Sequence, residues 1–256
     1  MFNNNKIKIT NYNIYSEKIH DDIVIAHLSD LHEKEFGHKN HRLFRAVAAL
    51  KPDIIAITGD LVAHERQKAA DIAYTENLAA GLSKIAPTYF VTGNHERHFH
   101  DEIVDALARN GVATIHGHIH SFMVGQSKIN LSGVHDTSYT GLSALHSIHF
   151  HNAENADGFN IFLSHRPEFF EWLSEKNVDL VLCGHTHAGQ IRFPKFGAFV
   201  MEGQGFFPKY VQGEYKNGDT TMIISRGLGS SGYPAIRINN PPDLVAINIR
   251  RQPAAA

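Results

Sequence analysis

The stretch DLVLCGHTHAGQ, residues 179–190, joins a short apolar run to two histidines that are one residue apart. Four consecutive apolar residues are typical of a buried strand, and Gly184 permits a sharp turn at its end. Four other apolar runs are also followed by Asp, Asn or His. They are residues 23–26, 53–58, 88–92 and 159–163. Strands without alternation of apolar and polar residues predict a mainly parallel sheet that is covered on both faces.

Segments with helical periodicity lie between these runs. They are residues 40–50, 66–85, 102–109 and, more weakly, 138–148, and Pro167 begins a further helix. Strand and helix alternate over the first hundred residues, as in an α/β fold. Residues 112–134 have instead the pattern of short strands with a turn at Gly125, which predicts a hairpin. We expect one domain over residues 1–252 and a disordered tail at 253–256.

The composition is that of an ordinary globular protein. The chain has 256 residues, 43% of them hydrophobic, which suffices for a substantial core. The formal net charge of −2 argues against a nucleic-acid-binding protein, which would carry a basic face. The one cysteine, Cys183, excludes an internal disulfide and is interpreted as a small buried hydrophobe. Without a signal peptide or membrane span we expect a cytoplasmic protein, and no obligate protein partner is evident.

The residues that follow the five apolar runs are of types that bind metals. Parallel strands of an α/β sheet bring the side chains at their carboxyl ends to one edge, where ligands bind. The candidates are Asp30, His32, Asp60, Asn94, His165, His185 and His187. The first two and the last two are pairs spaced two residues apart, a spacing that projects both side chains to one side of extended backbone.

The donor types restrict the metal. Imidazole and oxygen donors without a thiolate indicate Mn, Fe, Zn, Co or Ni and not a structural zinc site. Seven ligands are too many for one tetrahedral ion, but they suit two ions about 3.5–4 Å apart that clamp a displacement at phosphorus. Taken singly, Asp30/His32 and Asp60 are better explained as capping or surface residues. The metal interpretation depends on all the blocks occurring together and in order.

In these blocks the chain resembles the calcineurin-like metallophosphoesterase superfamily, from about residue 22 to 250. The blocks are Asp30-Leu-His32, Gly59-Asp60, Gly93-Asn-His-Glu96, His165 and Gly184-His-Thr-His187. Three longer stretches are similar to a bacterial branch of membrane- or cell-wall-associated, phosphodiesterase-like proteins: LSHRP (163–167), GHTHAGQIRFP (184–194) and SRGLGSSGYPAIRINNPPDL (225–244). The resemblance implies a four-layer αββα sandwich, in which two mixed β-sheets are flanked by helices.

The resemblance also implies a role for each residue. The first of two divalent ions would be bound by Asp30, His32, Asp60 and His187. The second would be bound by Asp60, Asn94, His165 and His185, so that Asp60 bridges the ions. Manganese is the expected metal, and a hydroxide that bridges the two ions would attack the phosphorus. His95 would stabilise the transition state or protonate the leaving oxygen. A phosphodiester or pyrophosphate substrate is favoured over a monoester by analogy with this branch.

Two positions depart from the pattern of many relatives. Ala63 stands three residues after Asp60, where a carboxylate often orients the catalytic histidine, so the residue that orients His95 is left open. The lack of a tyrosine there also argues against ferric-tyrosinate chemistry. Glu96 stands where aspartate is common, which is a milder change.

Other residues allow two interpretations. Arg166 and Arg226 either contact the substrate phosphate or form structural ion pairs. A second, similar motif, HGHIH, is interpreted as one exposed face of antiparallel structure and not as a metal site; its histidines are His116, His118 and His120. Aromatic residues after GHTH either pack a second sheet or form a rim for an acyl chain or membrane edge. They are Phe193, Phe196, Phe199, Phe206, Phe207 and Tyr210.

Two alternatives to a phosphohydrolase with a soluble substrate stay open. One is a non-catalytic scaffold of the same fold, which the presence of all seven ligands opposes. The other is an enzyme for a lipid-linked substrate, such as UDP-diacylglucosamine or a phospholipid head group, with peripheral membrane contact. The aromatic segment motivates the second alternative.

Overall fold

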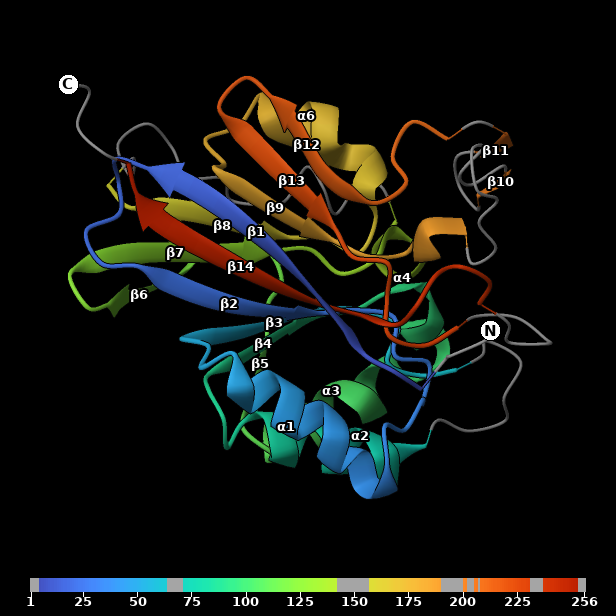
Figure 1. Cartoon of the computed structure of the whole chain (residues 1–256). Coiled ribbons are helices and arrows are strands. Elements are labelled where there is room, and N and C mark those ends of the chain that lie inside the picture. Colours follow the sequence, from blue (N-terminus) through green and yellow to red (C-terminus); the bar gives the residue numbers. More distant parts are fainter. Residues whose placement is uncertain are drawn as a thin grey trace.

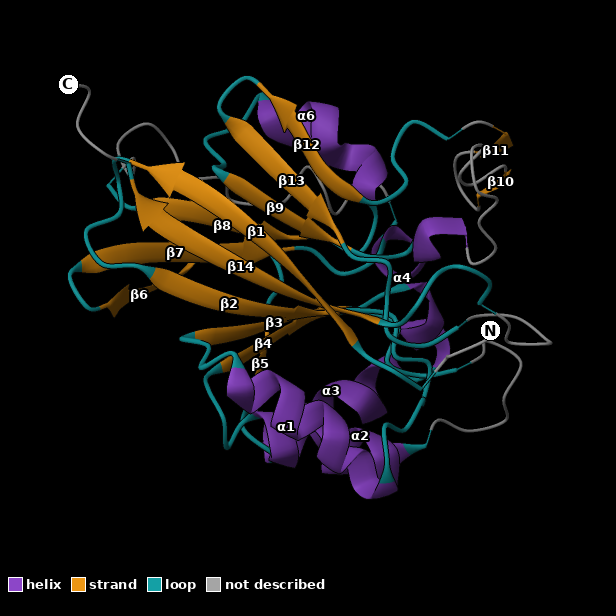
Figure 2. Cartoon of the chain, viewed as in Figure 1, coloured by secondary structure: helices purple, strands orange, loops and turns teal. Residues whose placement is uncertain are grey.

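The computed structural model describes residues 5–63, 71–141, 157–189, 200–201, 205–206, 208–230 and 237–252. Two six-stranded mixed sheets lie face to face, with helices on their outer faces (Figures 1 and 2). The first sheet is covered by α1 (His41–Ala49), α2 (Ile72–Leu82) and α3 (His100–Arg109), and the second by α6 (Phe170–Ser174). The expected four-layer αββα sandwich is confirmed.

The first sheet carries the amino-terminal half of the α/β pattern. Its spatial order is β1 (Lys8–Ser16), β14 (Asp243–Arg251), β2 (Ile23–Leu28), β3 (Ile54–Thr58), β4 (Thr88–Val91) and β5 (Val112–Thr114). Neighbouring strands are parallel except for β14 and β2, which are antiparallel. The amino-terminal segment forms the edge strand β1.

The second sheet has a parallel centre and antiparallel edges. Its spatial order is β12 (Gly213–Asn217), β13 (Thr220–Ile224), β9 (Leu180–Cys183), β8 (Phe159–Leu163), β7 (Ser127–Gly133) and β6 (His120–Val124). The four central strands run parallel, and β12 and β6 are antiparallel to their neighbours. A separate pair of two-residue strands, β10 (Val200–Met201) and β11 (Gly205–Phe206), lies outside both sheets.

Three apolar clusters correspond to the three interfaces between the four layers. The cluster between the sheets joins Ile25 and Ile54 of the first sheet to Ile161 and Leu180 of the second. The other two clusters join each sheet to its helices. Strands β3, β8 and β9 are buried along their whole length, as unbroken apolar runs predict. Each fully buried aliphatic side chain stabilises the fold by about 1.5–3 kcal/mol.

The predicted hairpin at 112–134 is partly wrong. Residues 112–114 form β5, which pairs in parallel with β4 and completes the first sheet. Only β6 and β7 form a hairpin, around Gly125, which has a left-handed φ of 56°. Strand β7 also pairs in parallel with β8, so its carboxyl end lies at the same edge as those of β8 and β9. The local pattern gave no information about these pairing partners.

The helices predicted at 40–50, 66–85 and 102–109 are present, with shifted boundaries. Helix α2 begins at Ile72, where the Asp71 side chain accepts the N–H of Tyr74; the earlier part of the predicted segment, 66–70, lies outside the described residues. Helix α3 begins two residues before its predicted start. Of the segment 138–148, the described part is the short helix α4 (Thr137–Thr140), and 142–148 lie outside the described residues. No described helix is both long and apolar enough to cross a membrane.

Candidate metal centre

Two groups of acidic and imidazole side chains meet at the carboxyl ends of the parallel strands. One ligand atom from each member of a group lies within 4.8 Å of the others. The first group is Asp30, His32, Asp60 and His187, and the second is Asp60, His165 and His185. Every member is buried, and Asp60 belongs to both groups. Side chains that follow separate strands therefore meet in one place, as the sequence predicts.

In the first group each imidazole directs its Nε2 atom toward the other ligand atoms. His32 Nε2 lies 2.9 Å from His187 Nε2 and 3.8 Å from Asp60 Oδ2, and His187 Nε2 lies 3.4 Å from Asp30 Oδ1. The Nδ1 atom of His32 lies 3.1 Å from the carbonyl oxygen of Val62, which can only accept. This contact requires the proton on Nδ1, so that the Nε2 lone pair faces the group.

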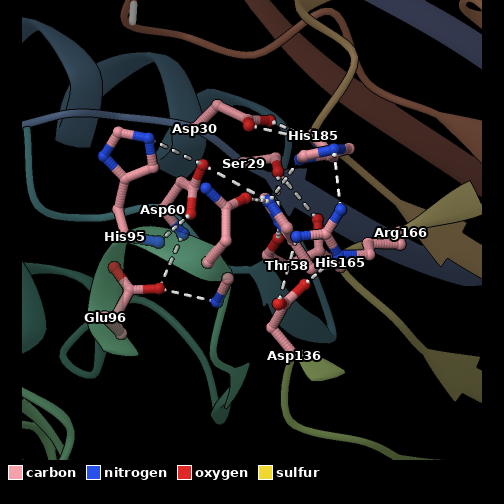
Figure 3. A network of polar contacts seen from close by, with 12 residues as sticks. Ser29, Asp30, Thr58, Asp60, His95, Glu96, Asp136, His165, Arg166 and His185 are labelled. Atoms are coloured by element: carbon pink, nitrogen blue, oxygen red, sulfur yellow. Dashed lines mark hydrogen bonds and ion pairs between the residues drawn. The ribbon is translucent and has the colours of Figure 1, made fainter. Parts of the chain in front are cut away.

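The second group has the same construction. His165 Nε2 lies 3.3 Å from Asp60 Oδ2, 3.2 Å from His185 Nδ1 and 3.1 Å from Asn94 Oδ1. Its Nδ1 atom lies 2.7 Å from the carbonyl oxygen of Thr58, which again places the proton on Nδ1 (Figure 3). Asn94, predicted from sequence, therefore lies beside the second group with its amide oxygen.

The backbone at this site is not extended, contrary to our expectation for the two paired motifs. Asp30, His32, Asp60, His185 and His187 all have positive φ, between 46° and 70°. Left-handed backbone is uncommon for residues other than glycine, and it persists only where the surroundings enforce it. The side chains of each pair thus converge because tight turns follow the strands, and not because extended backbone alternates.

The three glycines before the polar blocks serve two purposes. Gly59 has φ +85° and provides a sharp turn after β3. Gly93 and Gly184 instead permit close approach: a Cβ on Gly93 would lie 2.2 Å from Asp60 Oδ1, and one on Gly184 would lie 1.8 Å from Ser29 Oγ. These two positions must lack a side chain because neighbouring loops occupy the space.

Burial and mutual charge leave most of these groups ready to bind a cation. Burial lowers the pKa of His32 and of His185 to about 3, so both rings are neutral at neutral pH. Burial raises the pKa of Asp30 to about 6. Burial would also raise the pKa of Asp60, but the surrounding imidazoles hold it well below its usual range. Burial alone would lower the pKa of His165, but the Asp60 carboxylate raises it to about 10.

His95 lies beside the two groups and belongs to neither. Its Nε2 atom is 3.9 Å from Asp60 Oδ2, and its ring is edge-on to that of His32, with centroids 4.6 Å apart. Its backbone N–H donates to Asp60 Oδ1 at 3.0 Å. Asp60 and His32 are thus described neighbours of His95, whereas Ala63 offers it no carboxylate.

Arg166 is anchored by a residue that the sequence prediction missed. Asp136, whose side chain is fully buried, accepts from Arg166 Nε at 2.7 Å and from Nη2 at 3.3 Å. The third guanidinium nitrogen, Nη1, lies 3.2 Å from His185 Nε2 at the edge of the site (Figure 3). Asp136 follows β7, so the hairpin prediction concealed it. Recognition of β7 as a parallel strand would have revealed one more strand end with a carboxylate.

The structure favours the ion-pair interpretation for the other predicted arginine. Arg226 donates to both carboxylate oxygens of Asp243, at 2.9 and 3.1 Å, and to Thr10. A further arginine that was not predicted, Arg237, is fully buried and lies 3.2 Å from His187 Nδ1. It lies within the quoted stretch 225–244, but nothing in the sequence singled it out there.

The histidines of the second motif belong to neither group, but their predicted arrangement is wrong. His116 precedes β6 and is half-buried, with its ring stacked on that of His135 at 4.5 Å. His118 is exposed, and only His120 lies within a strand. The stacking of His116 on His135, a residue after β7, explains why the three histidines do not form one exposed face.

Two remaining predictions are resolved in part. Cys183 is fully buried in the cluster between the second sheet and α6, as expected for a small apolar residue. In the aromatic segment, Tyr210 packs edge-on against Phe170 and Tyr215. The side chains of Phe193, Phe196, Phe199, Phe206 and Phe207 lie outside the described residues.

Comparisons with known proteins agree with this geometry. Residues 23–189 match a family model described as calcineurin-like phosphoesterase. The chain is 29% identical over 227 residues to the uncharacterized metallophosphoesterase YkoQ of Bacillus subtilis, covering 86% of this chain and 81% of that protein. It is 27% identical over 237 residues to the phosphodiesterase YaeI of Escherichia coli, covering 88% and 81%. The structure of TT1561 from Thermus thermophilus matches with a TM-score of 0.50 at 15% identity, over 81% of this chain and 91% of that one.

Proposed function

The chain belongs to the calcineurin-like phosphoesterase family and is a metal-dependent phosphoesterase, and we propose that it cleaves a phosphodiester or pyrophosphate bond at a centre of two divalent ions. One observation carries this proposal: Asp60 is shared by two groups of ligand atoms that are buried side by side. A carboxylate common to two sites is the arrangement needed to hold two ions close together.

The donor sets fit the two ions. We assign Asp30, His32, Asp60 and His187 to the first ion, and Asp60, Asn94, His165 and His185 to the second. Neutral imidazoles with carboxylate and amide oxygens suit manganese, and Fe, Zn, Co and Ni are alternatives. When bound, the two ions would supply polarisation of the phosphoryl group and a water of lowered pKa.

Two further residues are assigned to the substrate. His95 lies next to Asp60 yet outside both ligand groups, which suits a group that stabilises the transition state or protonates the leaving oxygen. Arg166 is held by Asp136 through Nε and Nη2, so its guanidinium is oriented in advance for a phosphoryl oxygen. The diester preference is supported by the similarity to a relative named as a phosphodiesterase.

The test is hydrolysis of bis-p-nitrophenyl phosphate by the purified chain, after removal of metal and reconstitution with manganese. We expect two manganese ions per chain and turnover that is lost on chelation and restored with metal. Full metal loading without turnover of any phosphate ester would favour the scaffold alternative. A panel of nucleotides, cyclic nucleotides, nucleotide sugars and lipid head groups then defines the substrate.

A further inference from the structure

Glu96 is a buried carboxylate that accepts four backbone N–H groups. Its Oε1 atom lies 2.7 Å from Leu61 N and 3.3 Å from Val62 N, and its Oε2 atom lies 2.9 Å from Asp60 N and 2.6 Å from Gly93 N. The side chain is fully buried (Figure 3). Two loops that follow different strands, β3 and β4, are thereby joined through one side chain.

The same three residues, 60–62, hold the loop after β2 through their carbonyl oxygens. Asp60 O accepts from His32 N at 3.0 Å, and Leu61 O accepts from Glu33 N at 2.7 Å. Val62 O accepts from His32 Nδ1 at 3.1 Å, the contact that fixes the tautomer of this ring. Segment 60–62 therefore lies between Glu96, which accepts its N–H groups, and the loop of His32, which donates to its carbonyl groups.

This arrangement gives Glu96 influence over the metal centre through the backbone of segment 60–62. Successive N–H groups that converge on one point form a concave site for an anion, and here the Glu96 carboxyl group occupies that site. Asp60 begins this turn with a left-handed φ of 55°, a conformation that needs external support in a residue other than glycine. Both the shared carboxylate and the orientation of His32 thus depend on one turn.

We propose that Glu96 is a positioning residue of the metal centre, whose two carboxyl oxygens accept the N–H groups of segment 60–62 and so hold it where Asp60 and His32 present their ligand atoms. This inference rests on the proposed function, because it assigns the purpose of Glu96 to metal binding. Each carboxylate oxygen accepts two N–H groups. In a glutamine, either orientation of the amide would turn its NH₂ toward two N–H donors, so Glu96→Gln removes one of the two acceptor oxygens at constant size.

The experiment is calorimetric titration of metal-free protein with manganese chloride. We expect Glu96→Gln to lower manganese affinity by about 10–100-fold, the usual effect of removing a group that orients a ligand. Glu96→Asp keeps both acceptor oxygens and should retain most of the affinity. The matched control is Asp179→Asn: Asp179 Oδ2 accepts the backbone N–H of Asn160 at 2.7 Å, but it precedes β9 at the opposite end of the strand and should not affect manganese binding.

The outcomes separate this inference from the proposed function. Wild-type protein that binds no pair of manganese ions would contradict the proposed function itself. If the wild-type protein binds two manganese ions, two results would overturn only the role of Glu96. One is an unchanged manganese affinity in Glu96→Gln, and the other is an equal loss of affinity in Glu96→Gln and Glu96→Asp. If Glu96→Gln is unfolded without metal, it should fold as manganese is raised. Failure to fold at any manganese concentration, while Asp179→Asn folds, would show that Glu96 serves the fold and overturn the proposal.

Discussion

Two stretches of this chain, GHTH at 184–187 and GHIH at 117–120, differ in one letter and have different surroundings. His185 and His187 follow β9, an internal strand of the second sheet, and both are buried among the strand ends. His118 and His120 precede or begin β6, an edge strand, and His118 is exposed. The same pair of imidazoles thus becomes a candidate metal ligand at one place and not at the other.

The difference arises from the strand ends that lie next to each motif. Strand β9 ends beside β8, so His185 meets His165 and, across the sandwich, Asp60. Strand β6 runs antiparallel to β7, so its beginning lies near the carboxyl end of β7 and the stacked ring of His135, where the described residues include no carboxylate shared between two groups. Convergence of several strand ends, and not the motif itself, creates the site.

The largest effect should come from the residue that joins the two ligand groups. Asp60→Asn removes the shared charge, so we expect loss of both ions and turnover near the uncatalysed level. Elemental analysis after gel filtration measures the metal content. Retention of one tightly bound ion would show that Asp60 serves a single site and would contradict the bridging role.

Replacing one histidine in each motif tests the comparison itself. His187→Asn should remove the first ion and leave the second, whereas His120→Asn, at the equivalent position of GHIH, should leave two. Manganese titration of both variants gives the number of ions directly. If His120→Asn also lost an ion, the second motif would be a ligand and the contrast between the two stretches would fail.

This contrast also shows how far the sequence could lead. Apolar runs ending in Asp, Asn or His predicted an α/β sheet with these side chains gathered at one edge, because parallel strands order their ends without any knowledge of side-chain contacts. The two facing sheets and the sharing of Asp60 were implied only by the family resemblance. Asp136 escaped prediction since β7 has a hairpin pattern locally, while its parallel partner β8 lies about 30 residues away in sequence. The positive φ of Asp60 was also hidden, because it depends on Glu96 and the loop after β4.

Removing His95 should affect chemistry while leaving the metals in place. His95→Ala should reduce turnover about 10²–10⁴-fold, the usual contribution of a positioned acid or base, with two ions still bound. Steady-state kinetics and metal analysis on the same preparation separate the two effects. A loss of metal in this variant would make His95 a ligand.

Manganese affinity should depend on pH, because His165 and Asp30 of the metal centre bind protons that compete with the ion. The Asp60 carboxylate raises the pKa of His165 to about 10, so this ring holds a proton at neutral pH that an incoming ion must displace. Burial raises the pKa of Asp30 to about 6, so a second proton competes below that pH. Manganese affinity should therefore rise with pH, most steeply below about pH 6, where both protons compete. Equal affinity at pH 5 and pH 8 would contradict this.

The smallest effects should come from the glycines that open the two motifs. A Cβ on Gly184 would lie 1.8 Å from Ser29 Oγ and 2.5 Å from Asp30 Oδ2, so Gly184→Ala should cost about 1–3 kcal/mol through overpacking and weaken the first ion by moving Asp30. A Cβ on Gly117 would meet nothing within 4 Å, but its φ of +69° makes Gly117→Ala cost roughly 1–2 kcal/mol. Thermal unfolding should thus barely distinguish the variants, while manganese titration should. Equal manganese affinity in Gly184→Ala and Gly117→Ala would contradict this expectation. It would mean that close packing at Gly184 does not hold Asp30 in place.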